Sequence, residues 1–110
     1  MASFHKVSYY FVTEIKSSQN IVAYVNAMVK MSCNSSVWLY KPTYSRESRE
    51  FTADGMRQKM ELVSERESVL TIYQSVPSDA GVYSCVHGNH ARQYVLIVLH
   101  LRGDLQTVMI

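Results

Sequence analysis

The side chains with the most reactive chemistry in this sequence are two cysteines, Cys33 and Cys85, which lie 52 positions apart (33 to 85). Two such thiols either form a disulfide bond in an oxidising compartment or stay reduced as small buried hydrophobic side chains. A count of two does not decide between these alternatives. The residues around the cysteines therefore have to supply the evidence.

Two histidines, His87 and His90, lie on either side of the pair Gly88-Asn89. They could supply two ligands to a metal, but no third ligand is evident, so polar positions at the tip of a hairpin are the favoured interpretation. The chain also lacks a nucleophile-elbow motif and a glycine-rich phosphate-binding loop. We therefore predict a protein that is not an enzyme and that uses no metal, no cofactor and no small-molecule substrate.

The composition of the 110 residues is typical of one folded domain. Hydrophobic residues make up 47% of the chain and charged residues 18%, which provides enough apolar surface for one core. The net charge of +2 does not indicate a nucleic-acid partner. No apolar run is long enough to cross a membrane, so we expect membrane attachment only through an anchor outside this sequence.

Short stretches rich in Val, Ile, Tyr and Thr alternate with polar turns, and this pattern predicts an all-β protein. We expect strands over residues 7–15, 27–33, 37–41, 68–73, 82–86 and 94–99, and two short edge strands near 50–52 and 59–63. Gly88-Asn89 favours a tight hairpin between the last two strands. Strands of this number and length in about 100 residues predict a two-sheet sandwich.

The segment Asp79-Ala80-Gly81-Val82-Tyr83-Ser84-Cys85, preceded by Leu70-Thr71-Ile72, resembles the signature of immunoglobulin superfamily domains. The resemblance implies an immunoglobulin-like, two-sheet antiparallel Greek-key sandwich with one disulfide bond, between Cys33 and Cys85, that joins the sheets. Such a bond forms in an oxidising compartment. The resemblance therefore implies an extracellular protein, either on the cell surface or secreted.

The same resemblance implies roles for individual residues near Cys85. The hydroxyl of Tyr83 bonds to backbone upstream, and Gly81 lets the chain turn into the strand. Asp79 pairs with an arginine at the start of an earlier strand. Arg57 and Arg66 are both candidates for this arginine.

A tryptophan packed against the disulfide is also implied, and Trp38 is the candidate. Only four residues, Asn34-Ser35-Ser36-Val37, separate it from Cys33, which is shorter than the family pattern. Because two sheets stack roughly 10 Å apart, four extended residues can just cross between them. Tyr40 remains the alternative for the core position. The signature positions of the expected fold are Trp38, Leu70, Ile72, Asp79, Gly81 and Tyr83.

Residues 20–109 also resemble the second immunoglobulin domain of the insect defective-proboscis-extension-response proteins and their nematode relatives. The signature, the final strand Tyr94-Val95-Leu96-Ile97-Val98 and the tail over residues 102–109 carry this resemblance. It implies a neuronal cell-surface protein in synaptic partner recognition, with another immunoglobulin superfamily ectodomain as partner. Residues 1–16 would be a first strand or the remnant of a preceding domain, residues 17–102 the immunoglobulin-like domain, and residues 103–110 a C-terminal tail.

Strand alternation predicts a protein interface on the last two strands. If Tyr83 and Cys85 point inward, their neighbours point outward, and we place Val95, Ile97 and Leu99 of the last strand in the core. A one-residue shift in register, from a bulge near 91–93, would reverse this assignment. Contiguous exposed apolar side chains often mark an interface. The predicted interface consists of Val82, Val86, Tyr94, Leu96 and Val98.

Two short motifs add further hypotheses. Asn34-Ser35-Ser36 is an N-glycosylation sequon in a loop between strands, and Arg102-Gly103-Asp104 is the integrin-binding tripeptide. We predict an extracellular recognition or adhesion module that binds protein. The alternatives are an integrin ligand, an immune-type receptor domain and a structural spacer.

Overall fold

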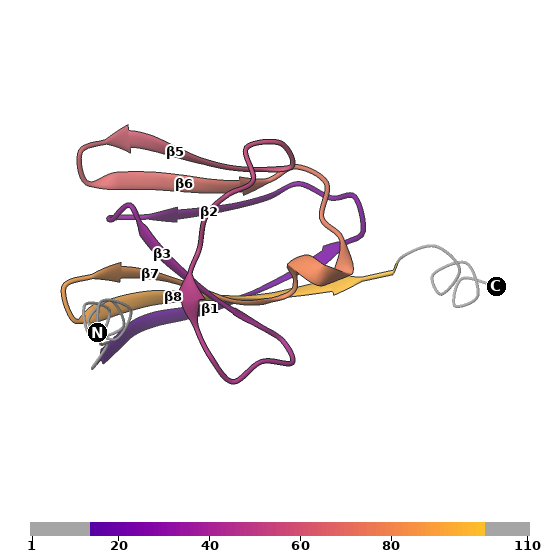
Figure 1. Cartoon of the computed structure of the whole chain (residues 1–110), viewed down its shortest axis with the longest axis horizontal. Helices are drawn as coiled ribbons and strands as arrows, with labels where there is room; N and C mark the ends of the chain where they lie inside the picture. Colours follow the sequence, from indigo (N-terminus) through magenta and orange to yellow (C-terminus); the bar gives the residue numbers. More distant parts are fainter. Residues whose placement is uncertain (1–13, 101–110) are drawn as a thin grey trace, which may run out of the picture.

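The computed structural model describes residues 14–100, which form two β-sheets that face each other (Figure 1). The strands are β1 (Glu14–Tyr24), β2 (Val29–Cys33), β3 (Val37–Pro42), β4 (Arg49–Glu50), β5 (Gln58–Ser64), β6 (Glu67–Ile72), β7 (Gly81–His87) and β8 (His90–Leu99). One sheet has the strand order β1-β8-β7-β3-β4 and the other the order β2-β6-β5. A single turn of 3-10 helix, η1 (Pro77–Asp79), precedes β7. The predicted all-β two-sheet sandwich is confirmed.

Strand β1 differs most from its prediction, which placed a strand at residues 7–15. Residues 7–13 lie outside the described part of the chain, and β1 continues to Tyr24 through the polar stretch 16–20. This stretch is extended because it pairs in parallel with β8, for example Gln19 with Tyr94, rather than because of its own β propensity. The other strand pairings within residues 14–100 are antiparallel. β1 spans residues 16 and 17, where the predicted domain boundary lies, whereas the tail at 103–110 lies outside the described residues.

The core lies between the sheets and is linked by the predicted disulfide. In β2 the side chains of Val29, Met31 and Cys33 are buried while the intervening ones are exposed, as expected for a strand with one buried face. Cys33 of one sheet is bonded to Cys85 of the other, with their Cα atoms 6.1 Å apart. The expected inter-sheet disulfide is confirmed.

The three residues between β2 and β3 carry the chain from one sheet to the other. The hydroxyl of Ser35 accepts a hydrogen bond from the backbone N–H of Val37 (3.0 Å), and its carbonyl accepts one from the hydroxyl of Ser68. The indole Nε1 of Trp38 donates to the same Ser68 hydroxyl at 3.0 Å. Trp38 is 2% exposed and occupies the core, whereas Tyr40 is half-buried, so Trp38 fills the position that the sequence left open.

The predicted corner at the start of β7 is present, and it selects between the two arginines. The hydroxyl of Tyr83 donates to the carbonyl of Asp79 at 2.6 Å. The buried Asp79 carboxylate accepts two hydrogen bonds from the Arg57 guanidinium, at 2.6 and 3.0 Å, and one from Gln58 Nε2 at 3.0 Å. Arg66 lies in the turn between β5 and β6 instead. Arg57 is therefore the partner of Asp79.

Candidate functional site

The turn between β7 and β8 determines which side chains of these strands reach the surface. Two residues, Gly88 and Asn89, connect the strands, and Gly88 adopts a φ of +66° that favours glycine. This connection pairs His87 with His90, and the regular ladder that follows places Tyr83 directly opposite Tyr94. Directly opposite residues of two antiparallel strands point to the same face of the sheet. Tyr94 therefore points into the core together with Tyr83.

The predicted interface on β7 and β8 is wrong because its side chains, except that of Val82, are buried or packed against the core. It consists of Val82, Val86, Tyr94, Leu96 and Val98. Tyr94 and Leu96 are 6% and 1% exposed and belong to the core, where the hydroxyl of Tyr94 donates to the carbonyl of Ser32 at 2.6 Å. Val98 is half-buried against the same core, and Val86 is 4% exposed. The prediction had the face of β8 wrong by one residue, although the β7–β8 ladder runs through residues 91–93 without a register shift.

The opposite face of β8 carries exposed apolar side chains, and β5 of the other sheet carries others, Met60, Leu62 and Val63. Ile97 and Leu99 are each 41% exposed, and they pair with Val22 (58% exposed) and Tyr24 (43% exposed) of β1. Nearer the turn, the half-buried Val95 pairs with the half-buried Val82 of β7. We call this surface the outer apolar patch; it consists of Val22, Tyr24, Val82, Val95, Ile97 and Leu99. The prediction that Val95, Ile97 and Leu99 lie in the core is wrong for the same reason of register.

The outer apolar patch is continuous across three neighbouring strands, β1, β8 and β7. Burying such apolar surface against a partner would contribute roughly 25 cal/mol of favourable free energy per Å² removed from water. Single exposed apolar residues are normal on a protein surface, but contiguous exposed apolar side chains on one face often mark an interface. This arrangement suits contact with another macromolecule.

Polar residues border the patch on the same face of the sheet. Lys41 of β3 lies opposite Val82, and its Nζ donates to the carbonyl of Ser45 at 3.1 Å. Towards the β7–β8 turn, the hydroxyl of Ser18 is hydrogen-bonded to Oε1 of Gln93 at 3.3 Å. An apolar centre with a polar rim is the usual composition of a protein–protein interface.

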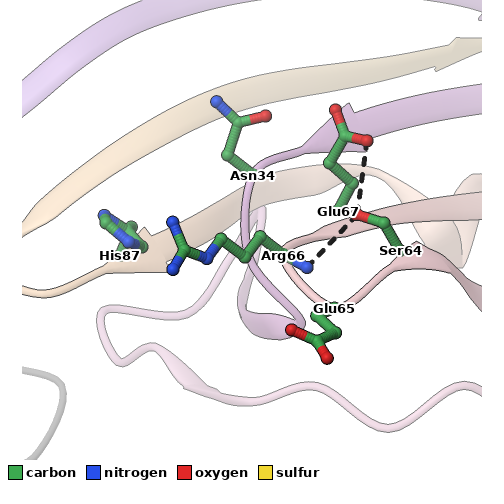
Figure 2. A pocket seen from close by; sticks show the side chains of 6 residues that line it. All are labelled: Asn34, Ser64, Glu65, Arg66, Glu67 and His87. Carbon is green, nitrogen blue, oxygen red and sulfur yellow. Dashed lines mark hydrogen bonds between the residues drawn. The ribbon is translucent and has the colours of Figure 1, made fainter.

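A shallow depression lies at the end of the sandwich that carries the β5–β6 and β7–β8 turns, which we call the hairpin end (Figures 1 and 2). Its lining is polar and consists of Asn34, Ser64, Glu65, Arg66, Glu67 and His87. Figure 2 shows the guanidinium of Arg66 extended towards His87, with Asn34 beside them. The sequon residue Asn34 is exposed in the loop between β2 and β3.

The two histidines of the hairpin end are separated by the turn. His87 lines the depression, whereas Nδ1 of His90 lies 3.0 Å from a carboxylate oxygen of Glu14. Within residues 14–100, no three His, Cys, Asp or Glu side chains come together as metal ligands would. In the same range, no helix has the length and apolar character needed to cross a bilayer. The tripeptide at 102–104 lies outside the described residues.

The sequence matches no protein-family profile and no curated protein. Solved structures are similar to it at the level of the fold. The Ig-like domain of human obscurin-like protein 1 is 12% identical over 80% of this chain and 83% of that chain, with a TM-score of 0.61. A domain described as IG27 is 13% identical over 76% of this chain and 91% of that chain, with a TM-score of 0.56. Domain I10 of titin is 19% identical over 73% and 89% of the two chains, with a TM-score of 0.54.

These similarities show that the chain has an immunoglobulin-like fold, as the signature around Cys85 implied. Domains with this fold are generally protein-interaction or structural modules rather than enzymes. Because the fold hosts many binding functions, the function has to be argued from the surface of this chain.

Proposed function

We propose that this immunoglobulin-like domain is a non-enzymatic extracellular recognition module that binds another protein through the outer apolar patch. The observation that carries the proposal is the run of exposed apolar pairs across β1 and β8, Val22 with Ile97 and Tyr24 with Leu99. These side chains lie on strands that are hydrogen-bonded to their neighbours in a sheet, and such a surface needs little ordering when it binds.

The disulfide supports the proposed location. Both cysteines of the chain are used in the bond between Cys33 and Cys85, and no thiol remains free. Bonds of this kind persist in the secretory pathway and outside the cell, whereas cytosolic thiols are kept reduced. We therefore place the domain at the cell surface or in the secreted fraction.

The shape of the patch supports a partner that also presents a sheet. Two β-sheets pack face to face at about 10 Å when alternate side chains of each interdigitate, and the alternate residues of β8 in the patch have this spacing. Another immunoglobulin-like ectodomain offers such a face. The sequence resemblance to neuronal surface proteins supports a more specific proposal, in which this recognition selects synaptic partners.

The proposal is tested by screening the domain against a panel of extracellular domains and then changing the patch. We expect at least one binder, and we expect Ile97→Glu or Val22→Glu to weaken that binding by about 30-fold or more, because each buries a charge at the centre of the contact. Leu62→Glu is the matched control, because Leu62 is 62% exposed on β5 of the other sheet. Thermal unfolding of each variant verifies that the fold is retained.

Two outcomes would count against this function. A panel without any binder, repeated with a flanking domain attached, would favour a structural spacer. Binding that tolerates Ile97→Glu and Val22→Glu but not Leu62→Glu would move the interface to the other sheet.

A further inference from the structure

We infer that Asn34 carries an N-linked glycan, which covers the hairpin end of the sandwich and leaves the outer apolar patch free. The inference rests on the proposed extracellular function, because the modification takes place in the secretory pathway. It names a modification site and assigns different uses to the two ends of the domain.

The two sequon residues that take part in the reaction are both accessible. Asn34 directly follows Cys33 at the end of β2, and its side chain is exposed, as is that of Ser36. Within residues 14–100, neither side chain makes a hydrogen bond or an ion pair. The amide nitrogen that would receive the sugar and the hydroxyl that the transferase recognises are therefore not used by the fold.

The middle residue of the sequon has the opposite role. Ser35 is half-buried, its hydroxyl accepts the N–H of Val37, and its carbonyl accepts the hydroxyl of Ser68. These two contacts hold the connection between the sheets. A glycan on Asn34 would therefore be added without breaking any contact that positions β2 and β3.

The transfer itself needs a donor that the secretory pathway supplies, an oligosaccharide linked to a lipid diphosphate. The bond between the anomeric carbon and the diphosphate oxygen breaks, and a bond forms between that carbon and Nδ2 of Asn34. The amide gives up one proton, and the lipid diphosphate is the leaving group. No oxidant or reductant is involved.

The surroundings of Asn34 suit a carbohydrate. The depression beside it is lined by hydroxyl, carboxylate, guanidinium and imidazole groups, which can hydrogen-bond to sugars, and Figure 2 shows Arg66 and His87 next to Asn34. This end is remote from the exposed apolar pairs. Leu99 and its partner Tyr24 lie at the far end of β8 from the β7–β8 turn, as the course of β8 in Figure 1 shows.

The experiment expresses the chain behind a secretory signal peptide in a glycosylating cell line. We expect the protein to carry one glycan, whose enzymatic removal leaves Asp at position 34 in peptide mass spectrometry. Asn34→Gln and Ser36→Ala should each abolish the glycan. Ser35→Ala is the matched control, because it changes the same loop but preserves the sequon, and it should keep the glycan.

The covering of the hairpin end is tested by carbethoxylation of histidines with diethyl pyrocarbonate. His87 lines the depression, whereas His100 is exposed just beyond the other end of β8. We expect the glycan to slow the modification of His87 relative to the enzymatically deglycosylated protein and to leave the rate at His100 unchanged. Equal rates at His87, or slowing at His100, would overturn the assignment of the two ends.

Glycan occupancy is measured on the secreted and on the intracellular pool, which separates the two proposals. Secreted, disulfide-bonded protein without a glycan at Asn34 would overturn this inference and leave the recognition function intact. Glycosylated protein that fails to leave the cell would count against the extracellular function and not against the modification.

Discussion

Tyr83 shows how one buried hydroxyl ties the start of β7 to the fold. Its side chain is 0% exposed, and its hydroxyl donates to the carbonyl of Asp79. Burial, with a smaller contribution from the neighbouring Tyr40, raises the pKa of Tyr83 well above its ordinary value of 10.0. The folded protein thus keeps a proton that the unfolded chain releases near pH 10. The stability associated with this group is complete below that pH and is lost as the pH rises.

Tyr83→Phe should therefore have two effects on the free energy of unfolding. At pH 7 it should lower that free energy by about 1–2 kcal/mol, because the carbonyl of Asp79 loses a buried donor. Above about pH 10 the loss of stability with pH should be less steep than in the wild type, because one buried phenol has been removed. Urea unfolding at a series of pH values measures both effects.

Tyr44→Phe is the control for this prediction, because Tyr44 is 100% exposed. It should leave both the stability at pH 7 and the alkaline slope unchanged. An unchanged alkaline slope in Tyr83→Phe would contradict the assignment of the raised pKa to this residue.

Strands β3 and β7 approach each other closely at Gly81. Gly81 lies opposite Pro42 at the start of β7 and adopts a φ of +148°. A Cβ atom added there would meet the carbonyl of Lys41 and would lie 2.8 Å from a ring carbon of Tyr40. The backbone contact cannot yield without moving one strand relative to the other. The glycine of the signature is therefore needed for the pairing of these strands.

Gly81→Ala should consequently destabilise the domain far more than a glycine change without such contacts. We expect a loss of about 3 kcal/mol or more for Gly81→Ala, from the clash and the unfavourable φ together. Gly55→Ala is the matched control, because Gly55 has a φ of +79° and nothing within 4 Å of the added Cβ. It should lose only about 1–2 kcal/mol, the cost of an L-residue in the left-handed conformation. Chemical unfolding of the two variants measures both losses of stability. Equal losses would contradict the steric explanation.

Across the whole molecule, the bond between Cys33 and Cys85 joins the two sheets through the core. It closes a loop over a sequence separation of 52 and is enclosed by the side chains of both sheets, with the cysteines 6% and 1% exposed. Closing a loop of this length stabilises a fold chiefly by restricting the unfolded chain. The sandwich is thus stabilised by a bond of the kind that persists in oxidising environments.

Cys33→Ala combined with Cys85→Ala should lower the free energy of unfolding by about 4 kcal/mol. Urea unfolding of the oxidised wild type and of the double variant measures the difference. A reductant should lower the stability of the wild type towards that of the double variant and leave the double variant unchanged. A wild type whose stability does not respond to complete reduction would contradict the proposed contribution of the bond.

Much of the fold could be predicted because its determinants are local in the sequence. Asp79, Gly81, Tyr83 and Cys85 are spaced so that one short segment contains the corner, the close approach and the bridging sulfur. The residue types are specific for these tasks. The resemblance of this segment to the immunoglobulin signature therefore implied the corner, the disulfide and the two-sheet architecture correctly.

The remaining assignments depended on which distant segments meet. Arg57 directly precedes β5 and Arg66 directly precedes β6 of the same hairpin. Only the packing of this hairpin against η1 brings Arg57 to Asp79. Trp38 reaches the core because the hydroxyl of Ser68, from another strand, accepts its indole N–H. Both partners of each contact can be named from the sequence, but only the folded structure shows that they lie within hydrogen-bonding distance.

The face of β8 was the most important error for function, and its cause is physical. Residues 94–99 are all apolar or aromatic, so alternation alone does not distinguish the buried face from the exposed one. The two-residue turn at Gly88-Asn89 supplies the missing register, because it places Tyr83 opposite Tyr94. The sequence by itself determined the fold, through the local signature around Cys85. Only the tertiary structure decided that Val22 and Tyr24 join Ile97 and Leu99 on the exposed face, because this depends on the parallel pairing of the distant strand β1 with β8.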